Sequence, residues 1–145
     1  MSQATPAAVP GLPTALQVAA GWRSSYALLA DGSVWAWGRN DQGQLGAIFG
    51  GASGELTAHH RASPVRIVSF PSDTEMRLSP GSAMALTMFV VLRDGTAMGS
   101  GWNLYGQMGT GDTTNVVIAS PIRGLGGGIV EIARGGGHTL VLKGG

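Results

Sequence analysis

The sequence has no cysteine among its 145 residues, which excludes disulfides and thiolate metal sites. Charged residues make up only 12%, about half of the average share, and the net charge is +1. The nine Lys and Arg residues are scattered, so the basic footprint of a nucleic-acid-binding protein is missing. No apolar run is long enough to cross a membrane and no segment resembles a signal peptide, so a cytoplasmic protein is the default expectation.

The residue types that enzymes and metal sites need are also sparse. The three histidines are His59, His60 and His138, and the adjacent pair lacks the further ligands that zinc requires. Glycine-rich stretches such as GRNDQGQLG are not followed by the long helix of a nucleotide-binding fingerprint. We therefore predict no catalytic residue, no metal and no cofactor, and we expect a protein that is not an enzyme.

Glycine, in contrast, is abundant, with 25 residues, and many of these glycines recur at fixed positions. The segment ADGSVWAWGRNDQGQLG at 30–46 reappears 63 positions later as RDGTAMGSGWNLYGQMG, with seven identities. The identical pairs are Asp31 and Asp94, Gly32 and Gly95, Gly38 and Gly101, Asn40 and Asn103, Gly43 and Gly106, Gln44 and Gln107, and Gly46 and Gly109. Recurrence at a fixed period indicates a repeat architecture.

A second segment recurs 114 positions apart. LQVAAGWRSSYALL begins at residue 16 and VEIARGGGHTLVL at residue 130, with Gly21 matching Gly135. The middle copy has Met84 at the place of this glycine. We predict a lead-in strand or linker at 1–15, a first repeat at 16–73, a second at 74–129 and a partial third at 130–145.

Each repeat is predicted to form short antiparallel strands. Asp31-Gly32 and Asp94-Gly95 each separate two apolar runs, which predicts hairpins with type I′ turns. Helical periodicity is not sustained over three turns anywhere in the chain. Four short strands in each repeat of this length predict an all-β fold built of propeller blades, with about two to two and a half blades in this chain.

The phrases WAWGRNDQGQLG and IARGGGHTLVL resemble the repeat of the regulator-of-chromosome-condensation (RCC-type) family over about residues 6–142. His138 fits the family's histidine, whereas Ser24 and Thr87 stand at the equivalent positions. The resemblance implies a propeller of about seven blades that serves as a protein-interaction scaffold, as a guanine-nucleotide exchange or regulatory module of a larger protein, or as a propeller-type enzyme inhibitor.

Gly21-Trp22-Arg23 also resembles a phrase of the plant ultraviolet-B photoreceptors of this family, so a tryptophan-based light sensor is an alternative. Tryptophan and arginine are enriched at protein contacts. The candidate partner-binding residues are Trp22, Arg23, His59, His60 and Arg61. The expected partner is a protein, with no nucleic acid and no membrane.

An arc of two blades and part of a third leaves two lateral faces without a neighbouring blade. We expect these faces to carry the apolar residues of the hairpins, which are Tyr26, Leu28, Val34, Trp35 and Trp37 in the first repeat and Phe89, Val91 and Met98 in the second. Exposed apolar faces of this size are rare on monomers. Either further blades or self-association is therefore expected to cover them.

Overall fold

The computed structural model describes residues 5–47, 60–71 and 74–145, and strands form its three sheets. The first sheet has the order β1-β2-β3-β4, and the second has the order β5-β6-β7-β8. The first comprises β1 (Ala15–Gly21), β2 (Ser24–Leu29), β3 (Ser33–Gly38) and β4 (Arg61–Ser69). The second comprises β5 (Met76–Leu78), β6 (Thr87–Leu92), β7 (Ala97–Gly101) and β8 (Val116–Pro121). Every pairing within these sheets is antiparallel.

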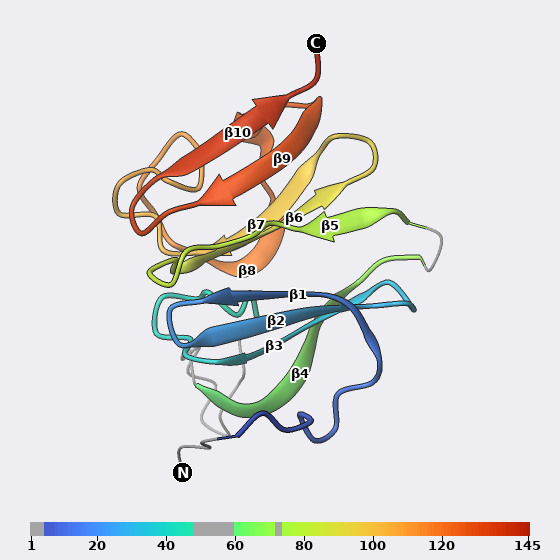
Figure 1. Cartoon of the computed structure of the whole chain (residues 1–145). Helices are drawn as coiled ribbons and strands as arrows, with labels where there is room; N and C mark the ends of the chain where they lie inside the picture. The colour runs from blue at the N-terminus through green and yellow to red at the C-terminus, as the bar shows by residue number, and fades with distance from the viewer. Residues whose placement is uncertain (1–4, 48–59, 72–73) are drawn as a thin grey trace.

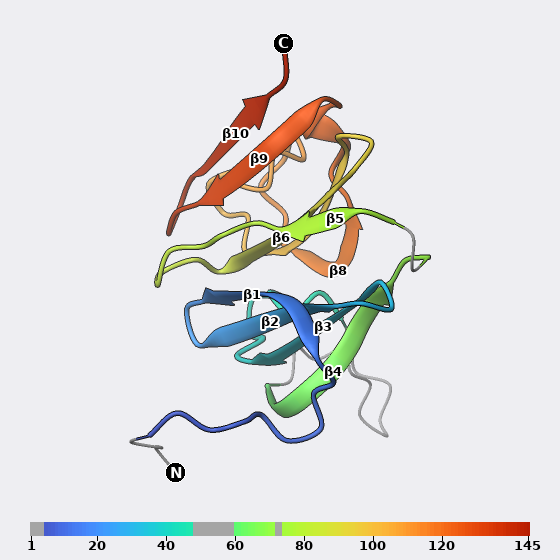
Figure 2. The same cartoon turned by 45° about the vertical axis from the view of Figure 1, so that its right-hand side comes forward.

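The third sheet contains only two strands, β9 (Ile129–Arg134) and β10 (Thr139–Lys143), and a short 3₁₀ helix, η1 (Arg123–Leu125), precedes it. The three sheets follow one another along an open arc, with the N-terminus at one end and the C-terminus at the other (Figure 1). The turned view shows the same succession (Figure 2). Within the described ranges, no helix is long and apolar enough to cross a membrane. The prediction of all-β blades with four short antiparallel strands is confirmed.

The two predicted hairpins are present, but the type I′ assignment of their turns is wrong. Gly32 and Gly95 have positive φ angles of 79° and 77°, whereas neither preceding aspartate is among the residues with positive φ. The aspartate side chain instead accepts the N–H of the residue two positions later, at 2.9 Å in both Asp31 and Asp94. This local bond keeps the aspartate in an ordinary conformation, and only the glycine adopts the left-handed one.

The apolar core lies between successive sheets. One cluster joins the first two sheets and has Tyr26, Leu28 and Val34 on one side and Met76 and Leu78 on the other. A second cluster joins the second and third sheets and contains Phe89, Val91, Ala97, Met108, Ile122, Ile129 and Ile132. Each blade therefore packs on the next mainly through side chains of its second and third strands, and the next blade contributes side chains of its first two strands, such as Met76 and Val90.

This arrangement corrects the expectation for the uncovered faces. Tyr26, Leu28 and Val34 are at most 4% exposed, because the second sheet covers them. Phe89 and Val91 are covered in the same way by the third sheet. The exposed apolar side chains of the lateral faces belong to β1 and β10, since the first sheet has no neighbour on one side and the third has none on the other.

Candidate functional site

Trp22 and Arg23 form the tight turn between β1 and β2. Arg23 has a φ angle of 58°, a left-handed conformation that costs a non-glycine residue about 1–2 kcal/mol. The Trp22 N–H donates to the carbonyl oxygen of Ala85 in the second blade at 2.8 Å. A Cβ atom at Gly21 would lie 2.6 Å from the same oxygen, so the glycine permits this approach. The turn is thus held against the neighbouring blade.

The loop after β3 brings a second arginine onto Trp22. The Arg39 N–H donates to the Arg23 carbonyl oxygen at 2.7 Å. The Arg39 guanidinium carbon lies 4.2 Å from the centre of the Trp22 ring, and that of Arg23 lies 5.3 Å from it. Both distances are within the range of cation–π attraction. Trp22 is half-buried, and the positively charged guanidinium groups of Arg23 and Arg39 both lie near its ring.

Asp41 completes the cluster. Its carboxylate accepts hydrogen bonds from Arg39 Nη2 and, at 2.6 Å, from Arg39 Nε, so the pair is bidentate. The hydrogen bond from Arg39 lowers the pKa of Asp41, and Asp41 in turn raises the pKa of Arg39. Both groups therefore stay ionised around neutral pH, and the bidentate bond holds the Arg39 guanidinium in place beside Trp22.

His60 and Arg61 line the same hollow. A pocket of about 580 Å³ is bounded by Arg23, Gly38, Arg39, Asp41, His60, Arg61 and Ala62. His60 Nδ1 accepts the backbone N–H of Asn40 at 3.0 Å, so this ring also anchors the loop after β3. The structure thus brings four of the five predicted residues together, while His59 lies outside the described residues. We call this group, together with Arg39 and Asp41, the Trp22 cluster.

The loop after each third strand is built in the same way in both repeats. Asn40 and Asn103 are fully buried, and their Oδ1 atoms accept the N–H of Leu45 and Met108 at 2.9 and 2.8 Å. The other hydrogen bonds of the loop also recur. The Gly43 N–H donates to the Asn40 carbonyl oxygen and the Gly46 N–H to that of Gly43, and the same two bonds join Gly106 to Asn103 and Gly109 to Gly106. The N–H groups of Gln42 and Tyr105 donate to the side-chain oxygens of Gln44 and Gln107. Gly38 and Gly101 take positive φ angles of 103° and 121° where this loop begins. These repeated residues shape the loop and leave its tip free to vary.

The tips of the two loops differ in chemistry. Trp102, Leu104 and Tyr105 of the second repeat stand at the positions of Arg39, Asp41 and Gln42 in the first. Trp102 and Tyr105 meet edge to face with ring centres 5.1 Å apart. Leu104 and Tyr105 are 56% and 69% exposed, and Met84 nearby is 62% exposed. The sequence analysis did not identify these residues, although a comparison of the positions that differ between the two copies, 30–46 and 93–109, would have found them.

The charged and apolar groups lie at the same end of the blades. The connections β1–β2, β5–β6, β7–β8 and β9–β10 all lie there, on the left of Figure 1, as do the described residues 39–47 that follow β3. The Asn115 side chain donates to the Gln42 side chain at 3.1 Å and so joins the two loops. We call this surface the loop end, and its apolar group consists of the exposed side chains of Met84, Leu104 and Tyr105 together with the half-buried Trp102.

His138 and Gly135 belong to the third β1–β2-type turn. The Gly135 N–H donates to the His138 carbonyl oxygen at 2.9 Å, and a Cβ atom at Gly135 would lie 2.4 Å from the His138 ring. The histidine therefore lies over the glycine of its own turn. In the described residues no group of three or more His, Cys, Asp or Glu side chains could hold a metal ion.

Four-stranded antiparallel blades that pack face to face along an arc define a β-propeller architecture. Two models described as "Regulator of chromosome condensation (RCC1) repeat" match the sequence, one at residues 16–44 and one at residues 31–78 and 94–142. The chain belongs to this RCC1 repeat family.

Curated relatives match most of this chain. The Ultraviolet-B receptor UVR8 of Arabidopsis thaliana is 32% identical over 128 residues, covering 88% of this chain and 27% of the receptor. The Probable E3 ubiquitin-protein ligase HERC4 of Rattus norvegicus is 31% identical over 128 residues, covering 88% of this chain and 11% of the ligase. The chain therefore spans only a small part of the length of these relatives.

Solved structures share the fold. Prp20p from Saccharomyces cerevisiae superposes with a TM-score of 0.70 at 20% identity, covering 95% of this chain and 33% of that one. Human WBSCR16 superposes with a TM-score of 0.68 at 25% identity, covering 90% of this chain and 31% of that one. The arc described here thus corresponds to about a third of each of these chains.

Proposed function

We propose that this chain is a protein-binding module and not an enzyme, and that it binds through its loop end. The observation that carries the proposal is the Trp22 cluster beside the apolar group of the loop end, which comprises Met84, Trp102, Leu104 and Tyr105. Tryptophan, tyrosine and arginine dominate the binding energy of protein interfaces. Hydrogen bonds within the loops hold these side chains on a rigid scaffold, which lowers the entropy cost of binding.

The charges of the surface indicate the chemistry of the partner. Arg23 and Arg39 contribute two positive charges to the Trp22 cluster, and Asp41, which pairs with Arg39, contributes one negative charge. A partner that presents carboxylates would pair with this positive excess, and an aromatic or aliphatic side chain of the partner would cover Tyr105 and Leu104. We therefore propose an acidic partner segment with an apolar anchor.

The protein partners of two similar solved structures support a binding role. Prp20p has binding properties to Gsp1p and histones, and the structure of Kap60 bound to yeast RCC1 (Prp20) has been solved. These partners are proteins, as the proposal requires. No described residue favours guanine-nucleotide exchange or enzyme inhibition over other forms of protein binding, so neither finer activity is proposed.

An array of synthetic peptides tests the proposed function. The array combines carboxylates with one aromatic or aliphatic residue and includes matched peptides in which amides replace the carboxylates. Wild-type chain should retain the acidic peptides, and Arg23→Gln or Tyr105→Ala should weaken retention at least tenfold, or about 1.4 kcal/mol. Arg66→Gln, an exposed arginine on β4, is the matched control. Equal retention by all variants, or no preference for carboxylates, contradicts the proposal.

A light sensor is the second candidate, because the Trp22 ring lies beside two guanidinium groups and the ultraviolet-B receptor is among the relatives. A sensor should change its association state under ultraviolet irradiation, as measured by light scattering. Trp22→Phe should abolish the change, whereas Trp35→Phe, in the middle of β3, should keep it. A wild-type chain whose association is unchanged by irradiation excludes this candidate.

A further inference from the structure

Gln44 and Gln107 occupy equivalent places in the loops after β3 and β7, and their side-chain oxygens have the same role. Gln44 Oε1 accepts the N–H of Gln42 at 2.9 Å, and Gln107 Oε1 accepts the N–H of Tyr105 at 3.0 Å. Both glutamines are buried, with 0% and 7% of the residue exposed. Because the oxygens are held in the same way, the two Nε2 groups also stand at equivalent places.

The two Nε2 groups differ in what they can donate to. Gln44 Nε2 donates to Asp41 Oδ1 at 3.3 Å. The equivalent position in the second loop holds Leu104, which has no acceptor. Gln107 Nε2 is buried and has no hydrogen-bond partner among the described residues. A buried donor without an acceptor is costly and rare in native proteins, so the second loop lacks an acceptor that the first loop supplies for itself.

The packing of one blade on the next does not provide this acceptor. Where the first loop meets the second blade, Asn115 donates to the Gln42 side chain and the Ser100 hydroxyl donates to the Gln44 backbone carbonyl oxygen. Gln44 Nε2 instead bonds Asp41 of its own loop. In the repeat, the neighbouring blade therefore contacts the loop at other atoms, and the acceptor for this donor comes from elsewhere.

The surroundings of Gln107 favour a neutral acceptor. In the first loop, the Asp41 carboxylate also pairs with Arg39, which offsets the cost of its partial burial. Trp102 stands at the position of Arg39 in the second loop, so no guanidinium is supplied there. A carboxylate placed among the apolar side chains of this loop would lose hydration without gaining a cation, whereas a neutral carbonyl oxygen needs only the amide donor.

We propose that Gln107 Nε2 donates to a backbone carbonyl oxygen of the bound partner, next to the apolar anchor of the partner segment. This inference rests on the proposed function and deepens it. Leu104 is 56% exposed, so its side chain would turn outward and open the donor to the partner. Trp102 and Tyr105 would then pack on the anchor, while the Trp22 cluster pairs with the carboxylates. Gln107 thus fixes where the anchor lies, because any other register leaves the buried donor unsatisfied.

Two isosteres of an acidic peptide retained in the array test this contact on the whole chain. At each amide bond flanking the anchor in turn, a ketomethylene group keeps the carbonyl oxygen and an (E)-alkene removes it. At one of these bonds, wild type should bind the ketomethylene peptide at least tenfold more tightly than the alkene peptide. Gln107→Glu replaces the donor by an acceptor and should bind both equally.

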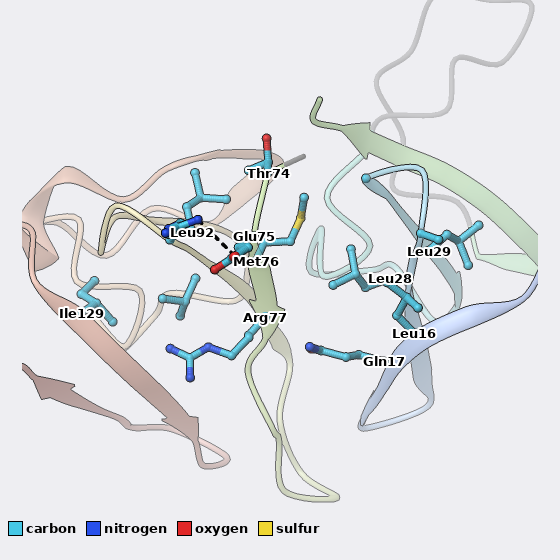
Figure 3. Close-up of a pocket in the computed structure, with 14 residues that line it drawn as sticks. Leu16, Gln17, Leu28, Leu29, Thr74, Glu75, Met76, Arg77, Leu92 and Ile129 are labelled. Carbon is cyan, nitrogen blue, oxygen red and sulfur yellow. Dashed lines mark hydrogen bonds and ion pairs between the residues drawn. The ribbon is translucent and has the colours of Figure 1, made fainter. Parts of the chain in front are cut away.

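Gln17→Glu is the matched control, because Gln17 lies in the groove of about 590 Å³ between the first two blades (Figure 3) and uses only its Oε1, which accepts the Leu78 N–H. This variant should keep the tenfold difference. If wild type retains no acidic peptide, the proposed function fails and this inference fails with it. Retained peptides whose isosteres bind wild type equally at both bonds overturn this inference alone.

A second measurement needs no partner. Leu104→Asn supplies a neutral acceptor from within the loop, whereas Leu104→Ala removes the same apolar side chain and supplies none. Leu104→Asn should therefore unfold at a higher temperature than Leu104→Ala, and the difference should vanish in a Gln107→Met background. Leu104→Asn should also bind the two isosteres equally, since its donor is already satisfied. Equal unfolding temperatures for Leu104→Asn and Leu104→Ala would show that Gln107 lacks no acceptor, and would overturn the proposal.

Discussion

Gly32 and Gly95 occupy the same place in the two long hairpins, and two independent constraints act on each. Both adopt positive φ angles, which side-chain-bearing residues rarely take. A Cβ atom at Gly32 would lie 2.4 Å from the Phe70 carbonyl oxygen, and one at Gly95 would lie 2.8 Å from the Gly128 nitrogen. The hairpin glycines thus serve both the turn and the close approach of a neighbouring segment.

Gly32→Ala and Gly95→Ala should therefore each destabilise the fold by more than the roughly 1 kcal/mol that is typical of point mutants. Valine at either position should cost more, because its branched side chain tolerates a positive φ poorly. Denaturant midpoints measure the effect. Gly127→Ala is the matched control, since an added Cβ there meets nothing within 4 Å and its φ is not positive. Midpoints for Gly32→Ala that equal this control would contradict the argument.

The two turn aspartates predict an acid-dependent loss of stability. The hydroxyl and N–H groups of Ser33 and Thr96 bond the Asp31 and Asp94 carboxylates and lower the pKa of each below its ordinary value of 3.8. Because these pKa values are lower in the folded chain, their contribution is complete above pH 3.8 and is lost as the pH falls through the folded values.

Unfolding by denaturant at a series of acidic pH values checks this dependence. The double variant Asp31→Asn, Asp94→Asn should lose less stability in acid than wild type, because it has no carboxylate to protonate at either turn. Asp31 and Asp94 are exposed, so the difference in stability between the two proteins should be small and should appear only in acid. Identical acid dependence in the two proteins would show that the turn bonds do not favour the ionised form.

At the scale of the elements, the loops after β3 and β7 are maintained by one buried amide each. Besides accepting the Met108 N–H, the Asn103 side chain donates to the carbonyl oxygens of Asp112 and Thr114 at 3.1 and 2.9 Å. A second polar side chain, just before the outer strand, accepts the backbone N–H of this asparagine. That acceptor is Asn115 in the second repeat, at 2.8 Å, and His60 in the first.

Asn103→Ala should cost about 1–3 kcal/mol, because it leaves the buried Met108 N–H without its acceptor. His60→Asn should be close to neutral, since Asn115 already performs the same task in the second repeat. His60→Leu removes the acceptor and should destabilise the first loop, so it should also weaken binding at the Trp22 cluster. Thermal unfolding and peptide retention measure the two effects. Equal stability of His60→Asn and His60→Leu would mean that the bond to Asn40 contributes nothing.

The hairpins could be predicted because each depends on residues close together in the sequence, and the repeat register and the blade architecture could be predicted because the same local pattern recurs 63 positions later. The turn type was wrong because the pattern Asp-Gly does not reveal that the Asp31 carboxylate bonds Ser33. The residues of the uncovered faces were predicted wrongly, because the alternation of side chains along β2 shows which residues share a face but not which face packs on a neighbouring blade. In the candidate site, Arg39 was missed because its contact with Trp22 joins two loops rather than one phrase.

At the scale of the whole molecule, Arg134 joins all three blades. This β9 side chain is 4% exposed and donates to the carbonyl oxygens of Ser79 at 3.0 Å and of Thr87 in the second blade. Its guanidinium carbon lies 5.7 Å from the ring centre of Tyr26 in the first blade. Burial lowers the pKa of Arg134, which shows that its desolvation is costly. No carboxylate among the described residues pairs with Arg134, so the bonds to carbonyl oxygens and the contact with Tyr26 offset that cost.

Arg134→Met keeps an unbranched apolar chain but removes these donors, and the carbonyl oxygens of Ser79 and Thr87 would remain buried without them. Each buried group left unsatisfied costs about 1–3 kcal/mol, so we expect a loss of several kcal/mol in the stability of the third sheet. The loss should be local, because β9 and β10 meet the second blade mainly through Ile129 and Ile132. Hydrogen exchange should therefore accelerate over 129–143 while β2 and β3 stay protected. Arg123→Met, at an exposed position of η1, should leave both regions unchanged. Exchange that accelerates equally in all three sheets would show that the arc unfolds as a single unit and that Arg134 stabilises the whole of it.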